Sequence, residues 1–210
     1  MRFADRREAG ERLAALITRL DLTDPIVLGL PRGGVPVAAL VADALGAPLD
    51  VIVVRKLGAP HHPEYAIGAV GEHGVRIVDE AAMRILGVGA DRMAQIERVE
   101  REELARRAAL YRRGRPQLDL TGRTAVVVDD GVATGATAAA ACRVARALGA
   151  TRVVLAVPVA PPEWTEDLRD EADELVAVES PTPFRAVGLW YSRFEQTTDD
   201  EVLAALAIRR

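Results

Sequence analysis

The chain has few aromatic residues, few histidines and a single cysteine, and each shortage excludes a class of protein. Phe, Trp and Tyr make up 4% of the sequence, so its core has to be built from Ala, Val and Leu. Cys142 alone cannot form an intrachain disulfide, and His61, His62 and His73 lack companions at zinc-ligand spacing. These shortages exclude a fold held together by disulfides or by zinc, and Cys142 is expected to be a small buried side chain.

Long apolar runs and a strong net charge are also missing. The residues from Met1 to Glu11 are charged throughout, unlike a signal peptide, and no apolar run reaches membrane-spanning length. The net charge is −4 and the isoelectric point is near 5.5, which gives no overall attraction for nucleic acid. We therefore expect a cytoplasmic protein with no membrane partner, and we do not favour nucleic acid as a partner.

The sequence does contain a regular alternation of short apolar runs and helical stretches. Strands are expected where β-branched residues cluster, and helices where apolar residues recur every three or four positions. The expected strands cover residues 26–30, 49–54, 125–128, 153–159 and 174–178, with hairpin strands at 67–70 and 75–78; the expected helices cover 5–20, 35–45, 80–86, 91–113, 137–148, 163–172 and 198–208. This alternation predicts an α/β fold in which a parallel sheet is covered by helices on both faces, within a single domain, 1–210.

Residues 125–137 carry the most specific signal in the chain. An apolar strand ends in two carboxylates, Asp129 and Asp130, and a loop of small residues then leads into an Ala-rich helix. Free backbone amides and the helix dipole at such a helix start favour a phosphate group. The two carboxylates could accept hydrogen bonds from ribose hydroxyls or hold Mg²⁺ through water. The alternative is an ordinary strand-to-helix turn of some other α/β protein.

This segment strongly resembles the signature of the type I phosphoribosyltransferase family, which is an apolar strand, two acidic residues and a Thr-Gly-x-Thr loop. The resemblance implies the three-layer fold of that family with a small hood subdomain, and a site for phosphoribosyl pyrophosphate (PRPP). It assigns the ribose of PRPP to Asp129 and Asp130 as catalytic and metal-binding residues, with Mg²⁺ as the cofactor. It assigns the 5-phosphate to Ala133, Thr134, Gly135, Ala136 and Thr137.

Two other polar segments follow expected strands and resemble parts of related enzymes. The Pro-Arg-Gly-Gly segment is similar to the pyrophosphate loop of xanthine-guanine phosphoribosyltransferases, which implies pyrophosphate contacts from Arg32, Gly33 and Gly34. A plain turn would need the glycines but not the arginine. Arg55 and Lys56 resemble the Arg-Lys pair of adenine phosphoribosyltransferases, and we count these two cations among the candidate catalytic residues at the same diphosphate.

The stretch that follows, from about 55 to 75, is expected to be a long irregular and flexible loop. A segment of this length that contains Pro and Gly is either functional or disordered. A lid would be useful, because water would hydrolyse an oxocarbenium-like transition state that is left uncovered. For His61, His62 and Glu64 within it, a role as solvated loop residues stands beside any catalytic role.

The segment from about 158 to 197 is expected to form the hood. Its cluster of aromatic residues resembles the Phe-x-x-Val-Gly segment of hypoxanthine-guanine phosphoribosyltransferases, which implies base binding by Phe184, Val187 and Trp190. An aromatic ring can stack on a base while backbone groups read its edge. The alternative is a hood core that does not touch a ligand.

The acceptor stays open, because the three resemblances point to different subfamilies. Ala133 stands where hypoxanthine-guanine enzymes have an aspartate that assists the purine N7, although the adenine family also has alanine there. The expected function is a Mg²⁺-dependent transfer of the phosphoribosyl group of PRPP to a nitrogenous acceptor, with a nucleobase favoured, as in nucleotide salvage. The alternatives are a PRPP- or nucleotide-sensing regulator without turnover, and an unrelated phosphate-binding α/β protein. The Arg- and Glu-rich helix 91–113 is interpreted as a solvated face rather than as a homodimer contact.

Overall fold

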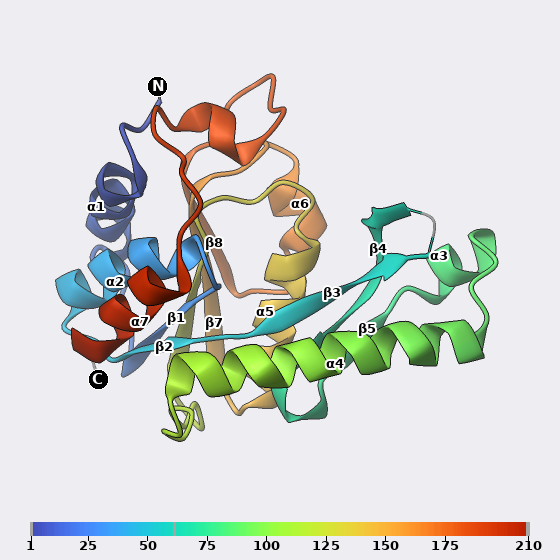
Figure 1. Ribbon diagram of the computed structural model, residues 1–210. Coiled ribbons are helices and arrows are strands. Elements are labelled where there is room, and N and C mark those ends of the chain that lie inside the picture. Colours follow the sequence, from blue (N-terminus) through green and yellow to red (C-terminus); the bar gives the residue numbers. More distant parts are fainter. Residues whose placement is uncertain (1, 61, 209–210) are drawn as a thin grey trace.

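The computed structural model describes residues 2–60 and 62–208, and a five-stranded parallel sheet lies at its centre (Figure 1). In chain order its strands are β1 (Pro25–Gly29), β2 (Leu49–Val51), β6 (Thr124–Val128), β7 (Arg152–Val159) and β8 (Glu174–Glu179). The order across the sheet is β2-β1-β6-β7-β8, and each neighbouring pair is parallel. The predicted fold class, a parallel sheet flanked by helices, is confirmed.

Successive side chains of these strands pack against helices on opposite faces of the sheet. In β6, Val126 and Val128 belong to one buried cluster, whereas Ala125 and Val127 belong to another. The helices on the first face are α1 (Arg6–Ile17), α2 (Gly34–Leu45) and α7 (Asp199–Ile208), and those on the second face are α5 (Ala136–Ala147) and α6 (Trp164–Leu168). Burial on both faces explains why the strands consist almost wholly of aliphatic residues.

A second, antiparallel sheet projects from the first together with a long helix, and we call this unit the arm (Figure 1). It consists of β3 (Val54–Ala59), β4 (His62–Gly71), the short turn η1 (Glu72–Gly74), β5 (Arg76–Val78), α3 (Glu80–Ile85) and α4 (Ala90–Arg112). The expectation of a long irregular loop at about 55–75 was therefore wrong, whereas the hairpin strands expected at 67–70 and 75–78 are confirmed, the first within β4 and the second as β5. The buried side chains of Leu57 and Ile67 join the core cluster that also contains residues of α4, and this packing makes the segment regular despite its prolines and glycines.

A buried group of charges joins the arm to the main sheet. The guanidinium of Arg112 donates to both carboxylate oxygens of Glu72 and to the backbone oxygen of Val51, and it lies 3.7 Å from a carboxylate oxygen of Asp50. All three charged side chains are at most 8% exposed. The sequence analysis did not single out any of them.

The hood is smaller than the expected segment 158–197. Strand β8 and helix α6 belong to the main sheet and its helical layer, so only residues 180–197, with the turn η2 (Val187–Trp190), lie over the sheet edge. The N-terminus completes the hood, since the amide of Phe3 donates to Trp190 O and Phe3 O accepts from the amide of Ser192, both at 2.8 Å. The Phe3 ring also packs on Tyr191, with ring centroids 5.4 Å apart.

Two expectations from composition concern the interior and the membrane. Cys142 is fully buried on α5, as expected, and this burial raises the pKa of its thiol to about 12. In the described ranges, none of the helices combines the length and the apolar character that crossing a membrane requires.

Candidate functional site

The candidate site lies where the order of the strands reverses. The chain runs from β1 through α2 to β2 on one side, and from β6 through α5 to β7 on the other, so β1 and β6 are neighbours whose connections diverge. In open α/β sheets a crevice forms at such a point, beyond the carboxyl ends of the strands. The Pro-Arg-Gly-Gly segment follows β1 and the acidic pair follows β6, so the crevice brings together two segments that the sequence analysis had selected separately.

The two glycines after β1 lie directly against the two aspartates after β6. A Cβ atom built on Gly34 would stand 2.8 Å from Asp129 Cα, and one built on Gly33 would stand 1.9 Å from Asp130 Oδ2. No side chain larger than hydrogen fits at either position without displacing an aspartate. The predicted pyrophosphate loop and the predicted ribose-binding carboxylates are therefore parts of one site.

The acidic pair is held in place by hydrogen bonds and is poorly solvated. The backbone amide of Asp130 donates to Asp129 Oδ1 at 2.8 Å, and the hydroxyl of Tyr191 donates to Asp130 O at 2.5 Å. Burial raises the pKa of Asp129 well above its usual value, and the nearby charge of Asp130 raises it further. Burial also raises the pKa of Asp130, while Arg6 opposes that change. Such a pair favours a ligand that brings hydroxyl donors or positive charge.

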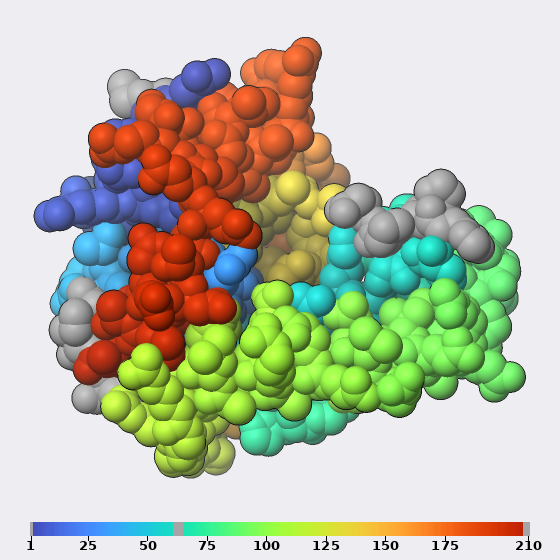
Figure 2. Space-filling model, in the orientation of Figure 1, coloured from blue at the N-terminus to red at the C-terminus, as the bar shows by residue number. Residues whose placement is uncertain are grey.

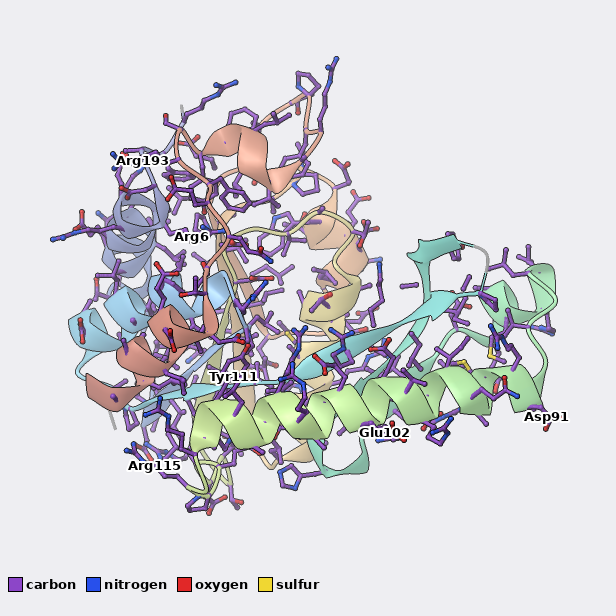
Figure 3. The ribbon with its side chains drawn as sticks, in the orientation of Figure 1. Arg6, Asp91, Glu102, Tyr111, Arg115 and Arg193 are labelled. Carbon is purple, nitrogen blue, oxygen red and sulfur yellow. The ribbon has the colours of Figure 1, made fainter. Side chains whose placement is uncertain are left out.

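Arg6, the first residue of α1, pairs with the second aspartate and was missed by the sequence analysis (Figure 3). Its Nε donates to Asp130 Oδ2 at 2.8 Å, and both side chains are 15% exposed. Its Nη1 donates to Glu195 O at 2.7 Å, and its guanidinium lies 4.0 Å from the centre of the Phe194 ring. These partners are 124 or more residues away along the chain, so no local pattern in the sequence could have indicated the contact.

The predicted 5-phosphate loop lines a cavity of about 150 Å³ beside the acidic pair. Gly135 has a φ of 76°, a backbone conformation that favours glycine, and it immediately precedes the first turn of α5. The residues around this cavity are Asp129, Gly131, Val132, Ala133, Thr134, Gly135, Thr137 and Ala138, while Ala136 is the first residue of α5. Figure 2 shows a hollow between the hood and the arm, with the yellow atoms of α5 and its preceding loop on the floor.

Arg32 extends from the pyrophosphate loop toward helices α7 and α4. Its Nη1 lies 4.0 Å from Asp199 Oδ1, and the hydroxyl of Tyr111 donates to the same oxygen at 2.7 Å. Burial and this hydrogen bond raise the pKa of Tyr111 to about 12. The phenol therefore acts only as a donor that holds Asp199 beside Arg32.

Arg55 and Lys56, the two cations that the sequence analysis assigned to one diphosphate, are adjacent residues of β3. Arg55 pairs with Glu100 of α4, with Nη2 2.6 Å and Nε 2.7 Å from Oε2. Lys56 follows it on β3, and successive residues of a strand point to opposite faces. Contact of both side chains with a diphosphate stays a prediction.

The candidate base-binding residues Phe184, Val187 and Trp190 all lie in the hood. A Cβ built on Gly131 would stand 2.5 Å from Val187 Cγ1, so Val187 covers the residue next to the pair. Phe184, Val187 and Trp190 are all partly buried against the cluster formed by Phe3 and its neighbours, which fits the alternative of a hood core. The loop candidates His61, His62 and Glu64 lie outside the residues whose side chains are described.

The two aspartates fit Mg²⁺ only as an ion that water and the phosphates of a ligand also coordinate. Within residues 2–60 and 62–208 there is no cluster of three or more His, Cys, Asp or Glu side chains suited to a metal. Magnesium is commonly bound by one or two carboxylates together with water and substrate phosphates. Asp129 and Asp130 match that pattern and could hold Mg²⁺ in this way.

Comparison with known proteins agrees with the geometry of the site. Residues 5–191 match the family model described as the phosphoribosyl transferase domain. The chain is 54% identical over 204 residues to "Putative phosphoribosyl transferase Rv0571c" of Mycobacterium tuberculosis strain ATCC 25618 / H37Rv, and equally to MT0597 of strain CDC 1551 / Oshkosh. These alignments cover 97% of this chain but 46% of each relative, so the chain spans about half the length of the curated relatives it matches. The crystal structure of TT1426 from Thermus thermophilus is similar over 98% of both chains, with a TM-score of 0.86 and 49% identity. The chain thus belongs to the type I phosphoribosyltransferase family, as the two aspartates and the loop after β6 predicted.

Proposed function

We propose that this protein transfers the 5-phosphoribosyl group of PRPP to a nitrogen of an acceptor, with a nucleobase favoured, and releases pyrophosphate. The observation that carries the proposal is the direct contact of the Gly33–Gly34 loop with Asp129 and Asp130, beside the cavity of the 5-phosphate loop. PRPP carries a 5-phosphate, a ribose diol and a diphosphate. These three groups match the cavity, the two aspartates and the glycine loop, respectively. The family match supports the same class of reaction.

In this mechanism the protein acts mainly by positioning and by stabilising charge. The carboxylates of Asp129 and Asp130 accept hydrogen bonds from the ribose hydroxyls, and their negative charge favours the positive charge that develops on the ring as the C1–O bond breaks. The backbone amides of Gly33 and Gly34 and the guanidinium of Arg32 stabilise the departing pyrophosphate. Asp129 and Asp130 would hold Mg²⁺, which would supply further positive charge to stabilise the leaving pyrophosphate.

The acceptor completes the reaction by attacking C1 from the side of the hood. Val187, which covers Gly131 beside the acidic pair, gives this side an apolar wall suited to a planar base. Ala133 has no group that could take a proton from the acceptor, so the loop itself does not select for a purine N7. This argument favours a base whose reacting nitrogen needs no acid or base from the loop.

A second candidate is a PRPP or nucleotide sensor that does not turn over its ligand. One observation favours it: Arg55, a candidate catalytic cation, is engaged by Glu100 of α4. A sensor would bind PRPP with Mg²⁺ but release no pyrophosphate with any acceptor.

The test combines binding and turnover on matched variants. Wild-type protein is incubated with PRPP, Mg²⁺ and a panel of nucleobases, and pyrophosphate release is measured beside calorimetric binding of PRPP. Asp130→Asn should lower turnover at least about a hundredfold with the fold intact, because it removes a charge next to the reacting ring. Asp91→Asn, an exposed acid at the start of α4, is the control and should behave like the wild type. Full activity of Asp130→Asn would remove the acidic pair from the mechanism, and binding without release would favour the sensor.

A further inference from the structure

Arg6 lies where three segments that are far apart in the sequence meet. It belongs to the start of α1, its ion pair with Asp130 reaches the strand end after β6, and its other contacts are with Glu195 and Phe194 of the hood (Figure 3). The hood also touches Asp130 directly, through the hydroxyl of Tyr191. Asp130 is thus tied to the hood by two routes, its carboxylate through Arg6 and its backbone oxygen through Tyr191.

The Arg6 contact differs from the ordinary surface ion pairs of the same helix. The neighbouring Arg7 pairs with Glu11 one turn later, but the side chain of Arg7 is 81% exposed and that of Glu11 is 55% exposed. Exposed pairs of this kind contribute little. The side chains of Arg6 and Asp130 are each 15% exposed. The edge of the planar Arg6 guanidinium donates hydrogen bonds to Asp130 and Glu195, and its face stacks on the Phe194 ring. The contact therefore restricts the orientation of the Asp130 carboxylate.

The residues around Arg6 direct its Nε to one carboxylate oxygen of Asp130, Oδ2. The missing side chain of Gly33 makes room, since a Cβ there would approach both Asp130 Oδ2 and, at 3.3 Å, Arg6 Nε. Asp5 caps α1 and pairs with Arg193 of the hood, which fixes the start of the helix. Because a carboxylate has two acceptor oxygens, Arg6 on Oδ2 leaves Oδ1 to accept from a ligand.

We propose that Arg6 is a positioning residue for the ribose of the donor. By holding Oδ2, it orients the Asp130 carboxylate so that Oδ1 meets the ribose diol, and it does so only while the hood is packed against α1. The inference rests on the proposed function and adds to it a link between the hood and the ribose half of the donor. Among the described residues, the Arg6 side chain donates to Asp130 and Glu195 and not to the Gly33–Gly34 loop, so Arg6 gives the pyrophosphate half no such link.

The experiment uses ligands that contain or lack the diol. Calorimetry in the presence of Mg²⁺ measures the affinity of the wild type, Arg6→Gln, Arg6→Lys and Arg7→Gln for PRPP, ribose 5-phosphate and inorganic pyrophosphate. Arg6→Gln should bind PRPP and ribose 5-phosphate at least about tenfold more weakly, the effect expected from one charge-assisted hydrogen bond, with pyrophosphate changed less than about twofold. Arg6→Lys should bind these two ligands more tightly than Arg6→Gln but more weakly than the wild type, because lysine keeps the positive charge but lacks the planar set of N–H donors. Arg7→Gln should match the wild type with all three ligands.

The outcomes separate a positioning role from a structural one. An equal loss for pyrophosphate, or unchanged affinity for ribose 5-phosphate in Arg6→Gln, would overturn the inference while leaving the proposed function in place. Melting curves show whether Arg6→Gln is folded, and if it is not, the same comparison of ligands is made with Arg6→Lys. A wild type that binds pyrophosphate but neither PRPP nor ribose 5-phosphate would overturn the proposed function itself and this inference with it.

Discussion

Replacing Gly33 with alanine should disable the donor site while leaving the main sheet intact. Gly33 has φ −62° and ψ −31°, which alanine adopts readily, so the cost comes from space and not from the backbone. The new methyl group would stand 1.9 Å from Asp130 Oδ2 and 2.7 Å from its Cγ. Ordinary contacts begin at 3.4 Å, so the carboxylate has to move by about 1.5 Å.

The size of the effect follows from what that movement breaks. Arg6 Nε is 2.8 Å from Asp130 Oδ2, and a shift of this size ends the hydrogen bond. A hydrogen bond to a charged group contributes about 1.5–3 kcal/mol, so we expect a loss of about 2 kcal/mol in the free energy of unfolding. The same displacement removes the carboxylate from the ribose, and about 2 kcal/mol corresponds to an affinity for PRPP roughly 30-fold lower.

Denaturant unfolding and PRPP calorimetry measure the two quantities, with Gly89→Ala as the matched control. Gly89 precedes α4 with φ −73°, and a Cβ there meets nothing within 4 Å. Alanine at this helix start costs no more than about 1 kcal/mol of stability, and PRPP affinity should not change. If Gly33→Ala bound PRPP as tightly as Gly89→Ala, the loop and the acidic pair would not form one site, and the argument for the donor would fail.

Two further substitutions test the charges that the fold buries. Burial raises the pKa of Asp129 in the folded protein above 3.8, so the wild type loses stability as the pH rises from about 3.8 to that raised pKa, and the loss is complete above it. Asp129→Asn should therefore have the higher melting midpoint at pH 7.5, with the difference disappearing toward pH 4. A midpoint no higher than that of the wild type throughout would contradict this. Arg112→Met leaves the buried carboxylate of Glu72 without its ion-pair partner and should lower the free energy of unfolding, measured with denaturant, by about 3–5 kcal/mol. In the control Arg98→Met, the side chains of the ion pair with Glu102 are 69% and 66% exposed, so the loss should be less than about 1 kcal/mol. Equal losses would mean that the buried pair does not stabilise the fold.

Most of the fold could be predicted because its elements carry local signals. Helix α2 begins at Gly34 and ends at Leu45, and the next residue, Gly46, has a φ of 60°, the left-handed conformation that glycine provides. The arm could not be predicted in the same way. Strand β3 holds two adjacent cations and Gly58, so it lacks a clear alternation, and only contact with α4 and with β4 makes it a strand. The strand conformation of β3 therefore depends on tertiary contacts, which the local sequence pattern does not reveal.

In the candidate site, too, the residues in local sequence motifs could be predicted and those brought in by the tertiary structure could not. Asp129, Asp130 and the glycines that contact them could be selected in advance because each follows a strand in a compact motif. Arg6 and Asp199, which approach that motif from the two ends of the chain, could not. The helix dipole explains an aspartate at a helix start but not an arginine there, and only the folded chain shows what Asp199 and Arg6 contact.

These second contacts also explain how the site can be assembled in the absence of a donor. Isolated charges in a poorly solvated crevice are costly, and three of the candidate charges here are compensated within the protein: Asp130 by Arg6, Arg32 by Asp199 and Arg55 by Glu100. The compensating residues come from α1, α7 and α4, which surround the sheet edge rather than form it. Residue 199 also lies beyond the matched range 5–191, so this partner belongs to a part of the chain that the family match does not include. A donor that binds Arg32 or Arg55 through its diphosphate must therefore exchange an existing ion pair for a new one. Its affinity then depends on the difference between two ionic contacts, and neutral substitutions in the surrounding helices should change that affinity without touching the ligand.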